Sequence, residues 1–153
     1  MKKVSFYTCR KRILRVWLWM SFIIILIFLL QTVNGKYNDL VKEVWQWLFQ
    51  YILPPITLMI GVFISQSLKR EDEDIEIDNF YFQLSYGISI FFLLILFLAP
   101  FSVPYIHLSM NTGLSDISKQ KNILDAYKVY DNFILPIQGI MMLCLGMFFT
   151  QSK

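Results

Sequence analysis

The sequence predicts an all-α membrane protein, a bundle of four transmembrane helices. Hydrophobic residues make up 56% of the 153 residues and charged residues only 16%. Four stretches carry no charge, and each reaches the roughly 20 residues that cross a ~30 Å hydrocarbon core. None has the polar stripe that a helix of this length needs when it faces water. The uncharged stretches are Val16–Gly35, Val44–Leu68, Asn79–Ser115 and Asn132–Ser152.

The chain is expected to form one polytopic domain over residues 1–153, with spans near 13–32, 45–68, 79–105 and 131–151. The second helix is expected to start ahead of its span, near Asp39, with Asn38 as its cap. The first span follows a basic segment, as the apolar region of a signal peptide does. Its apolar run is longer than a signal peptide's and lacks a small-x-small cleavage pattern, which favours an uncleaved anchor.

The distribution of Lys and Arg predicts that both termini lie in the cytoplasm. The N-terminal tail, residues 66–79 and Lys153 together hold nine Lys and Arg residues, whereas the two remaining loops hold five. An excess of Lys and Arg marks the cytoplasmic side. The predicted location is therefore the cell (inner) membrane, with the lipid bilayer as the protein's surroundings.

A short sequence pattern occurs twice. Phe49-Gln-Tyr-Ile-Leu-Pro54 resembles Asp131-Asn-Phe-Ile-Leu-Pro136, and each is followed by a glycine, Gly61 or Gly146. Two helical hairpins in the same orientation would explain this pattern. The proline-to-glycine separations differ by about one helical turn, so chance similarity between apolar helices stays open as an alternative.

Three prolines are predicted to kink their helices, because proline removes a backbone hydrogen bond. They are Pro54, Pro55 and Pro136. Gln46, Gln50 and Thr57 are close enough in sequence to offer replacement hydrogen bonds. Exposure of backbone carbonyls to a pore is the alternative interpretation.

Residues 115–130 are predicted to form a separate, short amphipathic helix. Ser115 can cap it, and Ile123, Leu124, Tyr127 and Tyr130 fall on one face. Such a helix is suited to lying in the headgroup region before the fourth span.

The chemistry of known catalytic, metal and cofactor sites is missing from the sequence pattern. No Asp, Glu, Lys, Arg or His is expected at mid-membrane depth, where ion-coupled transporters keep such groups. His107 is the only histidine, which excludes a His-Glu-x-x-His zinc motif. We therefore expect no catalytic residue, no metal site, no cofactor and no direct nucleic-acid binding.

Two charged segments are the candidate interaction sites on the cytoplasmic side. The acidic segment is predicted either to dock a protein partner, to pair with the basic tail or simply to be solvated. It comprises Glu71, Asp72, Glu73, Asp74, Glu76 and Asp78. The basic tail fits anionic lipid headgroups, each cation contributing ~1 kcal/mol near the surface, although setting the orientation would also explain it. It comprises Lys2, Lys3, Arg10, Lys11, Arg12 and Arg15.

The basic head, the four spans and the Ile-Leu-Pro segments at Ile52–Gly61 and Ile134–Phe149 resemble a known group of proteins. This group comprises the small membrane accessory proteins of bacterial defence loci, such as those encoded beside type VI-B CRISPR nucleases. The resemblance covers the layout of the whole chain and transfers no functional residue. It implies a non-enzymatic regulator of antiviral defence at the inner membrane.

Two functions are carried forward as hypotheses. The first is a non-enzymatic accessory protein whose cytoplasmic segments contact a soluble protein. The second is a homo-oligomeric channel or membrane-perturbing effector, in which the proline-containing second and fourth helices line the path. Small-residue pairs such as Gly61 and Ser65, spaced for close helix contact, are compatible with oligomers and with packing inside one copy.

Overall fold

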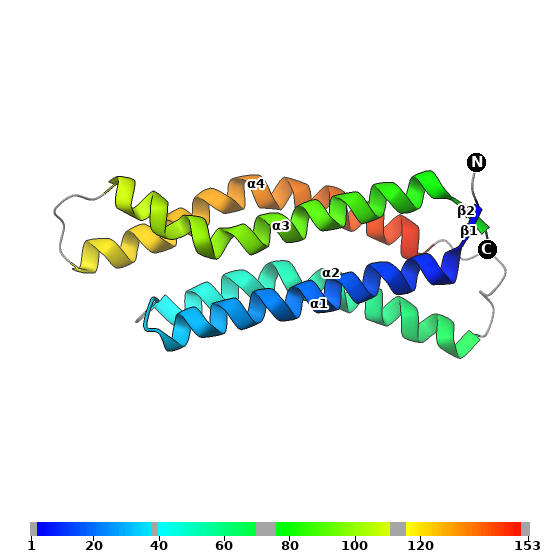
Figure 1. Ribbon diagram of the computed structural model, residues 1–153, viewed down its shortest axis with the longest axis horizontal. Helices are drawn as coiled ribbons and strands as arrows, with labels where there is room; N and C mark the ends of the chain where they lie inside the picture. The colour runs from blue at the N-terminus through cyan, green and yellow to red at the C-terminus, as the bar shows by residue number, and fades with distance from the viewer. Residues whose placement is uncertain (1–2, 38–39, 70–75, 111–115, 151–153) are drawn as a thin grey trace.

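The computed structural model describes residues 3–37, 40–69, 76–110 and 116–150, which form four long helices lying side by side (Figure 1). They are α1 (Phe6–Val33), α2 (Val41–Lys69), α3 (Asn79–Met110) and α4 (Asp116–Thr150). Each contains a segment long and apolar enough to cross a membrane: Tyr7–Val33, Val41–Ser65, Asn79–Ser102 and Asp125–Phe149. The predicted all-α, four-helix, multi-pass membrane protein is confirmed at this level.

The helices alternate in direction, so that α2 and α4 run the same way (Figure 1). α1 packs against α2 and α3, and α4 packs against the same two helices. The start of α1 and the end of α4 therefore lie at one end of the bundle. The chain follows the path of two hairpins in one orientation, while their origin as a sequence repeat stays a prediction.

Two helices extend beyond the spans predicted for them. α1 begins at Phe6, ahead of the span predicted from about Ile13, and α3 continues to Met110, past the span predicted to end near Tyr105. The early start of α1 places the cations from Arg10 to Arg15 within the first two to three turns of α1. The predicted cap at Asn38 lies outside the described residues.

The separate interfacial helix predicted for residues 115–130 is wrong, because the described part of that segment belongs to α4. One unbroken helix runs from Asp116 to Thr150. Tyr127 is buried in the bundle, and Tyr130 shares a hydrogen bond with Ser102 of α3. The described part of the face expected to contact lipid headgroups thus packs against other helices.

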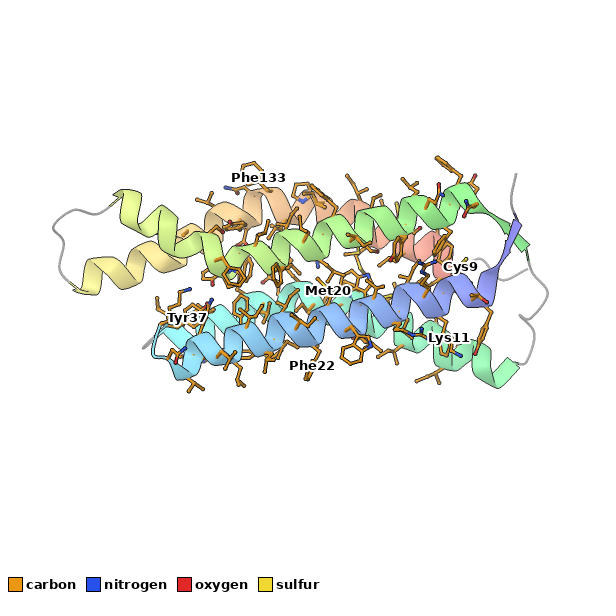
Figure 2. The ribbon with its side chains drawn as sticks, viewed as in Figure 1. Cys9, Lys11, Met20, Phe22, Tyr37 and Phe133 are labelled. Atoms are coloured by element: carbon orange, nitrogen blue, oxygen red, sulfur yellow. The ribbon has the colours of Figure 1, made fainter. Side chains whose placement is uncertain are left out.

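Large apolar side chains occupy both the core and the outer surface. Trp17, Phe28, Tyr51 and Phe92 are fully buried, whereas Phe22 and Phe133 point away from the neighbouring helices (Figure 2). A water-soluble bundle would place polar residues on that outer surface. Lipid is the solvent that suits it, because exposed apolar side chains carry no cost there.

A glycine ends α1 and allows the tight connection to α2. Gly35 has a φ of 70°, a left-handed conformation that glycine adopts without steric cost. The Gly35 amide donates to the Thr32 carbonyl at 3.0 Å, and the Lys36 amide donates to the Gln31 carbonyl at 3.1 Å. This pair of bonds is the Schellman motif, which satisfies the last carbonyls of a helix.

A two-stranded ribbon joins the N-terminal tail to the segment before α3. β1 (Lys3–Ser5) pairs antiparallel with β2 (Glu76–Asp78), with Lys3 opposite Asp78 and Ser5 opposite Glu76. Pairing between the basic tail and the acidic segment is one of the three alternatives predicted from the sequence. The ribbon pairs the backbones of Lys3–Ser5 and Glu76–Asp78, while pairing between the side-chain charges stays a prediction.

Arg10 ties the start of α1 to the end of α4. Its Nη2 donates to the carbonyl of Phe149 at 2.6 Å and to that of Phe148 at 3.3 Å. The side chain is 1% exposed and its guanidinium lies over the Phe149 ring. The prediction that Arg10 binds lipid headgroups is therefore wrong. The last carbonyls of a helix lack amide donors, and here the buried guanidinium of Arg10 donates hydrogen bonds to two of them.

Replacing Arg10 should loosen this end of the bundle. We expect Arg10→Met to lower the free energy of unfolding in mixed detergent micelles by about 1.5–3 kcal/mol, the contribution of a hydrogen bond to a charged group. Arg15→Met is the matched control, because Arg15 is exposed on the same helix and should change it by less than about 0.5 kcal/mol. Equal effects of the two substitutions would contradict the stabilising role of the hydrogen bonds between Arg10 and the end of α4.

Candidate functional site

The most distinctive polar group inside the bundle is the carboxylate of Asp131 on α4. Trp47 Nε1 and Tyr51 Oη, both on α2, donate to the same oxygen, Oδ1, at 2.6 Å each. We call Trp47, Tyr51, Tyr127 and Asp131 the aromatic–carboxylate cluster. Its three aromatic side chains are all buried.

Helical spacing explains how these four residues meet. Trp47 and Tyr51 lie four residues apart on α2, and Tyr127 and Asp131 lie four apart on α4, so each pair shares one helix face. The ring of Trp47 lies 4.7 Å from that of Tyr127 and 5.2 Å from that of Tyr51. Phe28 of α1 stacks against Trp47. The cluster thus joins three helices through ring contacts and one carboxylate.

Asp131 is the residue at which the fourth span is predicted to start. In the structure it lies within the continuous helix α4, and both of its donors come from α2. An ionisable group that bonds to a neighbouring helix at a span is a candidate functional residue. The sequence names Asp131 only as part of the repeat and as a span boundary.

A chain of hydrogen bonds continues from the cluster to the α1–α2 turn. Tyr37 donates to Oε1 of Gln31, which leaves Tyr127 to donate to the Tyr37 hydroxyl at 3.2 Å. Gln31 Nε2 and Lys36 Nζ donate to the carbonyl of Pro100 at 3.3 and 2.8 Å. Burial raises the pKa of Tyr37 and lowers that of Lys36. The network connects the turn to α3 and α4.

Proline explains why the Pro100 carbonyl accepts side-chain donors. In a helix this carbonyl would accept from the amide of residue 104, which is proline and has no amide hydrogen. Figure 1 shows α3 changing direction toward its C-terminal end, the part that contains both prolines. No kink is predicted from the sequence for this helix, although Pro100 and Pro104 would indicate one.

The predicted kink residues of α2 and α4 lie inside continuous helices. Pro54 frees the carbonyl of Gln50, and Gln138 of α4 donates to that carbonyl through Nε2 at 3.4 Å. Thr57, a predicted replacement partner, donates instead to the carbonyl of Leu53 at 2.7 Å. The side chain that donates to the carbonyl freed by Pro54 thus comes from the neighbouring helix, α4.

The charged segments predicted as interaction sites are only partly described. Lys3 belongs to β1, and Glu76 and Asp78 belong to β2. Lys11, Arg12 and Arg15 are exposed on α1, so contact with lipid headgroups stays a prediction for them. The remaining predicted positions lie outside the described residues, namely Lys2, Glu71, Asp72, Glu73 and Asp74.

The described residues hold no group of three His, Cys, Asp or Glu side chains that could bind a metal ion. A cavity of about 110 Å³ between α3 and α4 has a mostly apolar lining that includes Ser85 and Cys144. The residues that line the cavity are Tyr81, Leu84, Ser85, Cys144, Met147 and Phe148. The geometry of the aromatic–carboxylate cluster suits it to fixing α2 against α4.

Comparison with known proteins adds no relative. No protein-family model, curated protein or solved structure matches the chain. The resemblance to accessory proteins of defence loci therefore stays an expectation from the layout of the sequence.

Removing the Asp131 carboxylate should separate α2 from α4. We expect Asp131→Leu to lower the free energy of unfolding in micelles by about 1–3 kcal/mol for each buried donor left without an acceptor. Asp131→Asn keeps an acceptor oxygen and should cost less than half as much. Asp125→Leu serves as the control, because Asp125 is exposed and pairs only at the surface with Lys128. An Asp131→Leu variant as stable as this control would contradict the role assigned to the carboxylate.

Proposed function

We propose that this multi-pass membrane protein is a non-enzymatic accessory component that recruits a soluble protein to the inner membrane. The four apolar helices hold the chain in lipid. The Asp131 carboxylate, the Tyr37–Tyr127 pair and the Arg10 guanidinium bond to other side chains or to backbone carbonyls, as structural groups do, whereas Trp17 Nε1, Ser21 Oγ and Ser89 Oγ are buried without a hydrogen-bond partner among the described residues. Recruitment would use the end of the bundle that carries the ribbon.

The observation that supports this proposal most directly is the β1–β2 ribbon. It holds the N-terminal tail beside the segment that leads into α3, at the end where α1 begins. Lys11, Arg12 and Arg15 are exposed on the first turns of α1. In the sequence, the acidic residues 71–74 precede β2 with only Ile75 between them, and β2 itself includes Glu76 and Asp78. The segments that meet at this end thus contain residues of both signs of charge, a composition suited to a charged protein surface.

The proposed setting is the cytoplasmic side of a bacterial inner membrane. The excess of Lys and Arg at the ribbon end supports this orientation. The similarity in layout to accessory proteins of defence loci supports a regulatory role in antiviral defence. This role extends the recruitment proposal and is separable from it.

The acidic residues before the ribbon should be needed for recruitment. We expect replacement of Glu71, Asp72, Glu73 and Asp74 by Asn or Gln to reduce recovery of a crosslinked soluble partner at least about tenfold, because each loses a charge pair at the contact. Quantitative mass spectrometry after crosslinking in the native host measures recovery. Membrane levels of the protein should stay unchanged.

The control neutralises Asp125, an exposed acid at the opposite end of the bundle. It should leave recovery unchanged. Recovery of the same partner in equal amounts from all three proteins would remove the docking role of the acidic segment.

The alternative, a channel or membrane-perturbing effector, requires a path for solutes. The centre of one copy is filled by buried rings, including Trp17, Phe28 and Phe92. A path would thus have to form between several copies. The accessory role predicts that liposomes containing the purified protein retain an encapsulated dye as well as protein-free liposomes do. Leakage that increases with protein density would favour the channel instead.

A further inference from the structure

The outer surface of α2 differs from that of α1 in a way that lipid contact does not explain. Every exposed residue of α1 from Leu18 to Val33 is apolar. On α2 the exposed residues include Gln46, Gln50, Thr57, Gly61 and Ser65, which we call the α2 polar face. Spacings of four and seven residues place all five on one side of the helix. Thr57 donates to the carbonyl of Leu53 in its own helix, whereas Gln46 has no such bond, and a polar side chain that faces hydrocarbon without a partner is costly.

Packing within one copy accounts for neither Gln46 nor Gly61. The side chain of Gln46 is exposed and makes no hydrogen bond to any described residue. A Cβ atom added at Gly61 would meet nothing within 4 Å, which also holds for Gly87, Gly139 and Gly146. Glycine costs about 1 kcal/mol relative to alanine in a helix. Of these four glycines, Gly61 is the one that shares a helix face with Gln46, and the two residues together favour a contact outside the single copy.

We propose that a second copy of this chain packs on the α2 polar face, α2 against α2. Small residues such as Thr57, Gly61 and Ser65 let two helix backbones approach closely in lipid, and Gln amides hydrogen-bond across the contact. A side-chain amide is both donor and acceptor, so Gln46 can pair with its own counterpart. A two-fold contact uses the same face on both copies.

The start of α2 provides charge complementarity for this arrangement. Lys42 and Glu43 are adjacent and exposed. Copies inserted in the same orientation are related by an axis along the membrane normal, which makes their α2 helices parallel. Lys42 of one copy then lies near Glu43 of the other. Gln138 of α4 bonds to the Gln50 carbonyl, so α4 borders the contact without covering it.

Disulfide crosslinking tests the contact position by position. In a full-length chain with Cys9→Ala and Cys144→Ala, we expect Thr57→Cys and Gly61→Cys to form dimers of twice the 18.2 kDa protomer mass on mild oxidation in membranes. Phe22→Cys and Leu26→Cys, on the exposed apolar surface of α1, should stay monomeric. Crosslinking that is absent from α2, or equal on the two helices, would overturn the proposal.

Subunit counting in nanodiscs tests the unmodified chain, so that the result does not depend on the cysteine changes. We expect dimers, with Gly61→Leu weakening dimerisation at least tenfold. Gly87→Leu is the control, because Gly87 is also exposed and open, but on α3. A monomeric unmodified chain, or equal effects of the two leucines, would overturn the proposal. Modification of Gly61→Cys by a membrane-impermeant maleimide would also do so, since that face would then meet water.

Discussion

The structure depends on one constraint, which is that hydrocarbon offers no water to backbone groups lacking a partner. Three carbonyls show how the chain meets it. Pro104 leaves the carbonyl of Pro100 without an amide donor, and Lys36 and Gln31 donate to that carbonyl. Pro54 likewise frees the carbonyl of Gln50, to which Gln138 donates. The carbonyl of Phe149 lacks an amide donor because α4 ends there, and Arg10 donates to it.

This arrangement gives proline a structural role beyond bending a helix. The freed carbonyls of Pro100 and Gln50 are fixed acceptors on a helix surface, and the side chains that donate to them come from segments packed at the matching height. The bonds thereby fix how far helices slide along each other, which contacts between apolar side chains specify poorly. Arg10 acts on a helix end in the same way, and its burial is tolerated because carbonyls and the Phe149 ring surround it.

The sequence predicts the helices and their order because lipid imposes a length and a composition on each span. It could also have identified the carbonyls of Pro100 and Gln50, since each lies four residues before a proline. It could not pair each carbonyl with its donor. Gln138 stands out as an amide between apolar residues, and Arg10 is one of several cations near the start of the sequence, but only the fold shows which carbonyl each one bonds to. The donors to Asp131 were hidden for the same reason, because Trp47 and Tyr51 lie on another helix.

The two ends of the bundle are held by different means, which bears on function. At the turn end, aromatic rings and the Asp131 carboxylate fix α2 to α4, and a hydrogen-bond network fixes the turn to α3. At the ribbon end, the β1–β2 pair holds Lys3–Ser5 beside Glu76–Asp78, and Arg10 bonds the start of α1 to the end of α4. A protein binding there would meet a Lys3–Ser5 backbone that is already paired, so less conformational entropy is lost on binding. An α2 contact between copies would bring two such ribbon ends close together, and a dimeric partner could then bind both at a higher effective concentration.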